Sequence, residues 1–278
     1  MSNLKKFNNR VIILCIPALA GFGLFYIYPA VKSMYFSLID NTNTKNFVFF
    51  DNYISVLGNK YFRLALWNTA LFSIIGVALL LGVSLAVSFA LLKMSGGHSF
   101  IKRFFIMPML LPTAGIIAAW QLFFDNPGYF GLMKTSGFYV VLPVYLIYIW
   151  KNTGINIIII TAAASKIPRE IFEAVSLEGA KGFAIFRKIT LPCIAPALFF
   201  AGVLSFVNSL KIFKESYLFF GTAYPPDSAY ILQYYMNNHF QKLNYQILSS
   251  ATVIFTVIIS AVIIIFYAAE NKFSKDTY

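Results

Sequence analysis

The polar side chains that could do chemistry in this sequence lie within long apolar stretches. Ser205, Asn208, Ser209 and Ile212 recur at helical spacing, so they share one face of a helix. A polar stripe of this kind faces either a cavity that a polar solute could cross or a neighbouring helix with which it forms hydrogen bonds. The residues alone favour neither interpretation. In both, the chemistry is hydrogen bonding rather than bond making.

A second polar cluster interrupts the apolar run at 137–165. Its members are Tyr148, Trp150, Lys151, Asn152 and Thr153. Lys151 precedes Lys166 by about 22 Å of helix, at about 1.5 Å per residue, which places it toward the outer part of a membrane. Its amine either borders a solute pathway or snorkels to the interface. Lys211 and Glu215 are four residues apart and are spaced to pair with each other.

Patterns for catalysis or metal binding are scarce. The chain has 10 acidic residues, 2 histidines and 2 cysteines, and no phosphate-binding loop of the GxxxxGK[ST] type. We therefore expect no catalytic residue, no metal and no cofactor bound by this chain. Two alternatives to a transport subunit remain. A membrane-embedded lipid-modifying enzyme would need clustered carboxylates or histidines, and an ion-driven secondary transporter would need inverted repeats and buried acids.

The composition predicts an all-α integral membrane protein. Of 278 residues, 59% are hydrophobic and 12% are charged, whereas soluble domains carry about 25% charged residues. The net charge of +12 comes from residues between apolar runs, which indicates topology signals rather than nucleic-acid binding. The first apolar run is too long for a signal peptide and is interpreted as a retained span. Six spans are expected in a single domain, 1–278, at about 11–39, 64–92, 104–124, 137–165, 194–220 and 243–269.

Six spans place both termini on one side of the membrane. Lysine and arginine are about twice as frequent on that side, so both termini are predicted to be cytoplasmic. The charged loop at 166–192 is then cytoplasmic as well. We call this loop the docking segment.

The docking segment is too polar to cross hydrocarbon. Pro168 suits the first turn of a helix whose apolar side carries Ile171, Phe172, Val175 and Leu177. A second short helix is expected at 183–189, ended by Pro192. The residues fit two interpretations equally well: a docking element for another protein, or a loop on the lipid headgroups.

One motif in this segment resembles a known family. It reads Glu173-Ala174-Val175, then Gly179-Ala180, then Ile189 and Leu191-Pro192. The spacing is similar to the EAA motif of inner-membrane permeases of binding-protein-dependent ABC importers, with Val175 and Glu178 as mild departures. IPALAGFGLFYIYPAVKSMYFSL and SFVNSLKIFKESYLF look like the first and fifth helices of the sugar-type branch that includes the larger maltose permease subunit. GTAYPPD departs from the turn that often follows the fifth helix in that branch.

The resemblance implies a type I ABC importer permease fold in a bacterial inner membrane, without catalytic residues. It also implies partners: a second homologous permease, two ATPase subunits that hold ATP and magnesium, an extracytoplasmic solute-binding protein and the lipid bilayer. No nucleic acid is expected. The docking segment would hold the coupling helix, and the residues that would couple it to the ATPase are Glu173, Ala174, Gly179, Ala180, Ile189, Leu191 and Pro192.

The resemblance further implies a solute pathway. Positions that match solute contacts of the maltose permease are Tyr148, Lys151, Asn152 and Ile155 on the fourth helix, and Ser205, Ser209 and Ile212 on the fifth, with Asn208 on the same face. Most residue types differ from that permease, so maltose itself is not expected. The implied solute is a carbohydrate or related compound, such as an oligosaccharide, a sugar acid or a glycerol phosphate. Lys151 and Lys211 are compatible with an anionic one.

Overall fold

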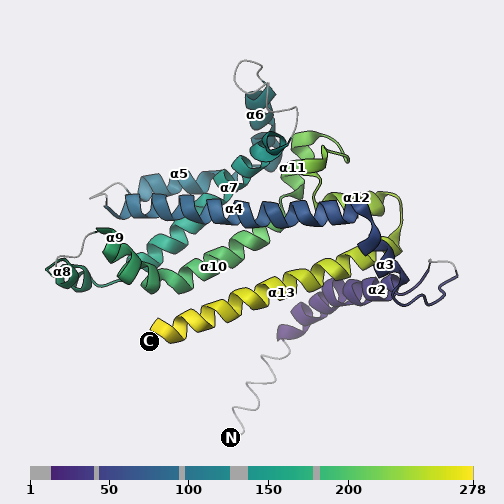
Figure 1. The fold of residues 1–278 in the computed structure, drawn as a ribbon, viewed down its shortest axis with the longest axis horizontal. Coiled ribbons are helices and arrows are strands. Elements are labelled where there is room, and N and C mark those ends of the chain that lie inside the picture. Colours follow the sequence, from purple (N-terminus) through teal and green to yellow (C-terminus); the bar gives the residue numbers. More distant parts are fainter. Residues whose placement is uncertain (1–13, 41–43, 94–97, 126–136, 178–181, 278) are drawn as a thin grey trace, which may run out of the picture. The chain divides into compact units, whose positions relative to one another are not determined.

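The computed structural model describes residues 14–40, 44–93, 98–125, 137–177 and 182–277, which are mostly helical (Figure 1). Five helices in this part of the chain are long and apolar enough to cross a membrane, or six if one bent pair counts as a single span. The expected all-α membrane architecture is therefore confirmed. The described chain divides into two compact units, which are taken separately below; the expectation of a single domain stays a prediction.

The first unit contains the first span and the start of the last one. The first span covers Leu14–Ser37 and includes a π-helical turn, η1 (Gly23–Ile27), and α2 (Tyr28–Ser37). A short helix, α3 (Asp51–Gly58), is fastened to the end of this span. The side-chain amide of Asn52 donates to the backbone oxygens of Ser37, at 3.0 Å, and Ile39, at 2.8 Å. The loop after the first span is thus held by backbone oxygens that the helix end leaves open.

The second unit holds most of the other helices. They are α4 (Lys60–Lys93, from Arg63 on), α5 (His98–Leu110), α6 (Thr113–Asp125), α7 (Phe138–Ala164), α8 (Arg169–Leu177), α9 (Gly182–Ile185), η3 (Phe186–Thr190), α10 (Leu191–Leu210), α11 (Phe213–Phe220) and η4 (Asp227–Ala229). Like α4, the helices α12 (Leu232–Gln241) and α13 (Tyr245–Thr277) have residues in both units. α7 lies at the centre of the second unit, because it packs against both α5 and α10.

The packing of α5 on α7 depends on Gly154. A Cβ atom added at this glycine would collide with the carbonyl oxygen of Phe105 and lie 2.6 Å from its carbonyl carbon. The backbone of α5 therefore approaches α7 more closely than any side chain would allow. Small residues permit such close approach between helices in membranes, where van der Waals packing drives association.

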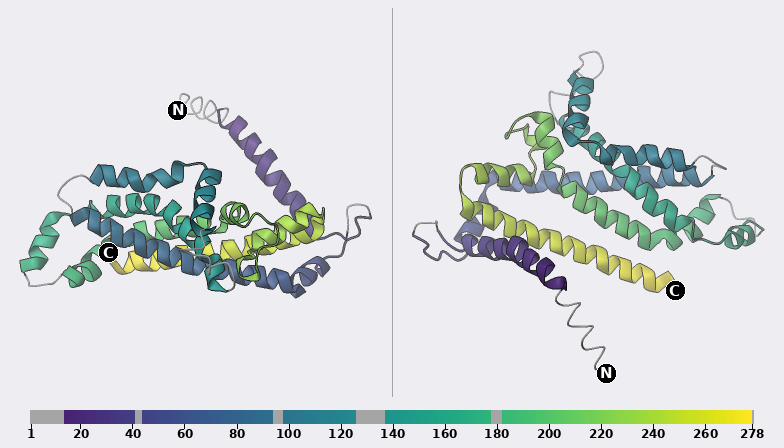
Figure 2. Two further views of the ribbon diagram at one scale, coloured as in Figure 1. Left: turned by 90° about the horizontal axis from the view of Figure 1, so that it is seen from above. Right: turned by 180° about the vertical axis from the view of Figure 1, so that it is seen from behind.

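The third span is bent, contrary to the expectation of one helix over 104–124. The pair Arg103–Leu110 and Thr113–Phe124 meets at an angle of 103°, and Figure 2 shows α6 pointing away from α5. Pro112 explains where the break falls, because a proline donates no hydrogen bond and disfavours a helical conformation at the residue before it. The apolar run is continuous, so composition alone did not reveal the bend.

The predicted end of the second docking helix at Pro192 is wrong. α9 continues through the π-helical turn η3 directly into α10, and Leu191 keeps helical angles (φ −62°, ψ −45°). Within η3, the Leu191 amide donates to the Phe186 carbonyl, five residues back. The wider π turn gives the proline ring room that a regular α-helical turn would not provide. From Gly182 onward, the docking segment is therefore continuous with the fifth span as one helical run.

Candidate functional site

Side chains of α7 and α10 join the two helices by hydrogen bonds within the apolar bundle. The Tyr148 hydroxyl donates to the backbone oxygen of Ser205 at 2.7 Å, and the Asn156 amide donates to the Ser205 hydroxyl at 2.8 Å. The Ser209 hydroxyl contacts that of Ser73 on α4 at 2.8 Å. All five residues are buried. For Ser205 and Ser209 the structure thus shows hydrogen bonds to neighbouring helices, which was one of the two interpretations of the polar stripe. We call this set the seam.

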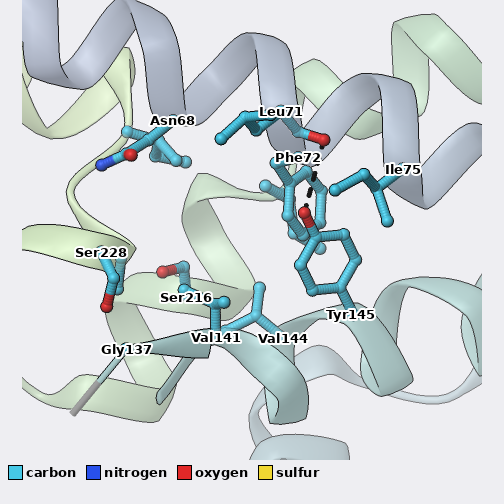
Figure 3. A pocket seen from close by; sticks show the side chains of 13 residues that line it. Asn68, Leu71, Phe72, Ile75, Gly137, Val141, Val144, Tyr145, Ser216 and Ser228 are labelled. Atoms are coloured by element: carbon cyan, nitrogen blue, oxygen red, sulfur yellow. Dashed lines mark hydrogen bonds between the residues drawn. The ribbon is translucent and has the colours of Figure 1, made fainter. Parts of the chain in front are cut away.

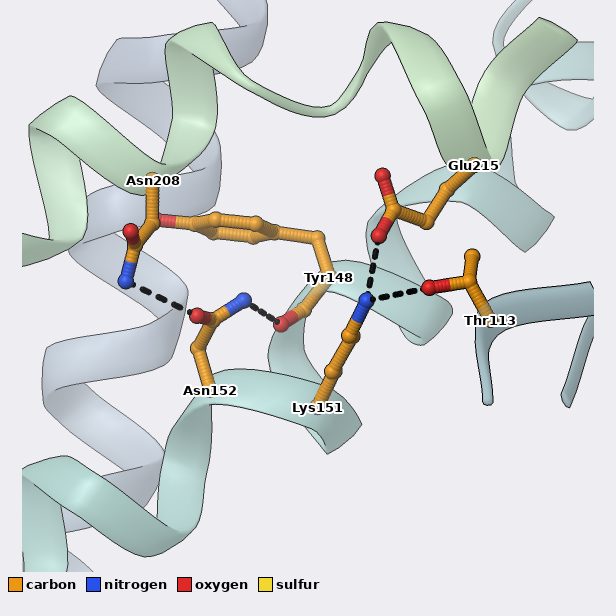
Figure 4. Close-up of polar contacts among 6 residues, drawn as sticks. All are labelled: Thr113, Tyr148, Lys151, Asn152, Asn208 and Glu215. Atoms are coloured by element: carbon orange, nitrogen blue, oxygen red, sulfur yellow. Dashed lines mark hydrogen bonds and ion pairs between the residues drawn. The ribbon is translucent and has the colours of Figure 1, made fainter. Parts of the chain in front are cut away.

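Four other residues of the predicted pathway, three of them polar, remain partly accessible. Lys151, Asn152, Ile155 and Asn208 are half-buried, and we call them the pathway face. The Asn208 amide donates to the side-chain oxygen of Asn152 at 3.0 Å, and Asn152 donates to the Tyr148 backbone oxygen at 2.8 Å (Figure 4). The structure therefore brings residues from the fourth and fifth spans together, with the seam behind them.

Lys151 is held by two side chains from other helices. Its amine forms an ion pair with Glu215 on α11 and donates to the Thr113 hydroxyl on α6 at 3.1 Å (Figure 4). The expected pairing of Glu215 with Lys211 is therefore wrong: Glu215 is buried, whereas Lys211 is exposed. A lysine that is 80% covered next to a carboxylate is a cross-link between three helices rather than a snorkelling amine.

A cavity of about 300 Å³ lies beside the seam, between the starts of α4 and α7 (Figure 3). Ile212, the last of the predicted pathway residues, is 4% exposed and lines it. Phe72 and Tyr145 supply aromatic walls, and the Tyr145 hydroxyl points to the Leu71 backbone oxygen at 3.4 Å. The Asn68 amide is engaged with backbone oxygens of the chain that follows α11. The cavity is therefore mainly apolar, with a volume at the lower end of the range for small-molecule sites.

The docking segment lies at the end of the second unit away from α11 (Figures 1 and 2). Its first helix is confirmed as α8, with Glu170 in the first turn. Of the predicted coupling residues, Glu173 is exposed and Ile189 and Leu191–Pro192 lie in the continuous helix after it. Gly179 and Ala180 fall outside the described residues, as does the side chain of Ala174.

Apolar side chains of the docking segment remain uncovered. Ile171 is 39% and Phe183 is 75% exposed. Between the segment and the ends of α4 and α7 lies a groove of about 870 Å³, which Phe172, Phe183 and Phe186 line with other apolar residues. Phe89 of α4 closes part of it by packing edge-on against Phe186, with ring centroids 5.0 Å apart. A small helix with an uncovered apolar side needs a partner surface to be stable.

The sequence alone did not identify several residues of the site. Asn156 is 1% exposed and sits four residues after Asn152, so its helical spacing was the available signal. Thr113 and Gly154 gave no comparable signal, because their roles depend on contacts between helices. Glu215 was singled out but assigned to the wrong partner, since Lys151 is 64 positions away in the sequence.

Comparisons with known proteins place the chain in a family. The model of a family described as "binding-protein-dependent transport system inner membrane component" matches residues 78–275. LacF, a lactose transport system permease protein of Rhizobium radiobacter, is 25% identical and aligned over 98% of both chains. UgpA, an sn-glycerol-3-phosphate transport system permease protein of Escherichia coli, is 30% identical over 70% of this chain and 71% of its own.

The fold is also found in a solved structure. A chain of a bacterial ABC transporter involved in the import of the acidic polysaccharide alginate superposes with a TM-score of 0.80, covering 98% of this chain and 99% of that one, at 17% sequence identity. At this identity the likeness shows the type I permease fold alone. Together with the multiple apolar helices, the family match makes this a multi-pass protein of the bacterial inner membrane. The chain belongs to the inner-membrane permease components of binding-protein-dependent ABC transport systems.

Proposed function

We propose that this chain is one of two permease subunits of an ATP-driven importer for a carbohydrate or a related solute. The observation that carries the proposal is the family match over residues 78–275. Named relatives serve lactose and sn-glycerol 3-phosphate, which are polar and hydroxyl-rich. Family membership also argues against a lipid-modifying enzyme and an ion-driven transporter. The chain itself contributes no catalytic residue.

The docking segment is the proposed contact with the ATPase subunits. Three observations support this role: α8 lies at one end of its unit, Phe183 is 75% exposed, and η3 runs into α10 without a break. A displacement of the part from Gly182 onward would pass into the fifth span, because the helix continues through η3 into α10. The coupling residues are Glu173, Ala174, Gly179, Ala180, Ile189, Leu191 and Pro192.

The pathway face is the proposed border of the solute pathway, with a second permease supplying the opposite wall. Its half-buried amides offer hydrogen bonds to hydroxyl groups, while the seam behind it keeps the two helices in register. The buried residues of the predicted pathway would then position this face rather than contact the solute throughout the cycle. They are Tyr148, Ser205, Ser209 and Ile212. A solute-binding protein would deliver the solute from outside.

ATP would drive the cycle from the partner subunits. A nucleotide shifts a two-state equilibrium only if it binds the two states with different affinity. Closure of the ATPase dimer supplies that difference, and the docking segment transmits it as a rigid-body movement of α7 and α10. The chain would thus convert ATPase closure into alternating access.

Co-purification with the ATPase tests this function. Wild-type chain expressed with the neighbouring genes should retain the ATPase subunits through affinity purification, and proteoliposomes should take up a solute only with ATP inside. A bulky residue in Gly179→Leu should release the ATPase. Gly58→Leu is the matched control, because a Cβ at Gly58 meets nothing within 4 Å and Gly58 lies in α3, outside the docking segment. An unaltered ATPase content in Gly179→Leu would refute the coupling role.

A further inference from the structure

The charge of Lys151 is already balanced inside this chain. Its amine pairs with Glu215, and the two side chains are 20% and 10% exposed. The described parts of α4 from Leu64 to Leu92, of α7 and of α10 contain no other charged side chain. The charges at Lys211 and Lys214 are exposed, so solvent and salt screen them. The pathway face therefore presents no net charge to a solute.

An anionic solute would meet a specific obstacle at this face. To bind the Lys151 amine it would have to displace the Glu215 carboxylate, which would then remain buried beside a second anion. Leaving one member of a buried ion pair without its partner is strongly unfavourable. A solute with hydroxyl groups meets no such obstacle. The half-buried amides of Asn152 and Asn208 have more donors and acceptors than their two known contacts use.

We infer that Glu215 is a specificity-determining residue: as the resident counter-ion of Lys151, it makes the pathway selective for neutral, polyhydroxylated solutes over sugar acids and phosphates. The inference rests on the proposed function and narrows its solute class. It also reverses the role expected for Lys151 from the sequence, because the lysine is part of a neutral pair. Glu215 acts through Lys151 and is a positioning residue in that sense.

Glucose and glucuronate form a matched pair of probes, because they differ by one carboxylate. The complete importer is placed in lipid nanodiscs, and its thermal unfolding midpoint is measured with either sugar or with inorganic phosphate, at equal millimolar concentration and constant ionic strength. The unfolding midpoint of the wild type should rise no more with glucuronate or phosphate than with glucose. Glu215→Gln frees the Lys151 charge and should bind glucuronate about tenfold more tightly than wild type does, since an uncompensated charge in a partly buried site attracts an anion strongly. The double variant Lys151→Gln/Glu215→Gln should lose this preference.

Two results would overturn the inference. One is greater stabilisation of the wild type by glucuronate than by glucose; the other is a folded Glu215→Gln variant without anion preference. If Glu215→Gln does not assemble, a transport measurement decides. Excess glucuronate should leave ATP-driven uptake of the delivered solute by wild type unchanged, and inhibition would overturn the inference. A wild-type complex without any ATP-driven uptake would instead refute the proposed function, so the two failures are distinguishable.

Discussion

Polar side chains between α7 and α10 find partners within the chain, whereas two apolar side chains of the docking segment, Ile171 and Phe183, stay exposed. In the seam, Tyr148 and Asn156 both converge on Ser205 from a neighbouring helix. In the docking segment, Phe183 projects with three quarters of its surface exposed. Both regions drew attention in the sequence by the same feature, residues of the wrong polarity for their surroundings. Residues of unexpected polarity therefore indicate a binding surface for another protein only where the fold leaves them exposed.

The largest expected effect is in the closely packed part of the molecule, where α5 lies against α7. Gly154→Ala places a methyl group against the backbone of Phe105, which cannot rotate away as a side chain would. Overpacking costs about 1–3 kcal/mol where side chains adjust, and we expect the upper end or more here. The unfolding midpoint in detergent should fall sharply. Gly115→Ala is the control, because a Cβ there meets nothing within 4 Å. Equal midpoints for the two variants would show that α5 and α7 are not tightly packed.

A second prediction addresses the exposed apolar side chains of the docking segment. Phe183→Ser removes an exposed ring, so the stability of the chain itself should not decrease. If the ring is an anchor for the ATPase, its loss should weaken attachment by about 2 kcal/mol, or roughly 30-fold. Quantitative co-purification measures the attachment and thermal unfolding the stability. Tyr224→Ser serves as control, since Tyr224 is 63% exposed but follows α11, remote from α8. If Phe183→Ser lowered the stability of the chain but kept the ATPase, Phe183 would pack within this chain rather than against a partner.

A third variant probes a single bond of the seam. Tyr148→Phe deletes the hydroxyl that donates to the Ser205 backbone oxygen and leaves the ring in place. The expected loss is about 1 kcal/mol of unfolding free energy, typical for one hydrogen bond. Tyr139→Phe on the same helix removes a hydroxyl from a residue that is 59% exposed, and should cost nothing measurable. If both variants unfold like wild type, the seam contributes packing but no hydrogen-bond energy.

The spans and the first docking helix were predictable because their signals are local. Long uncharged runs identified the spans, and Pro168 followed by acidic residues identified the start of α8. Pro112 accounts for where the third span breaks, but the direction of the bend depends on what α6 packs against. Gln121 of α6 donates to the Leu218 and Phe219 backbone oxygens, and this contact with α11 has no trace in local sequence.

The site was predictable in membership but not in arrangement. Helical spacing correctly grouped Ser205, Asn208 and Ser209, yet it could not tell that two of them are buried and one is accessible. The pairing of Glu215 was predicted by the four-residue rule for isolated helices, which weighs exposed pairs at only a few tenths of a kcal/mol. A buried partner from another helix overrides so weak a preference. Residues whose role is set by another helix therefore need the three-dimensional structure.

The smallest expected effect concerns α12, outside the membrane-spanning segments. Burial, and secondarily the charge of Lys242, lowers the pKa of His239 below its ordinary value of 6.5. The folded chain therefore favours the neutral imidazole, while the unfolded chain takes up a proton as the pH falls below about 6.5. Unfolding thus becomes easier on acidification, so the midpoint should decrease between pH of about 7.5 and about 5.5. His239→Gln should flatten this part of the pH profile. If the unfolding midpoint of His239→Gln declined more steeply than that of the wild type, the folded state would stabilise the protonated imidazole. The surroundings of His239 in α12 would then resemble the exposed docking segment rather than the buried seam.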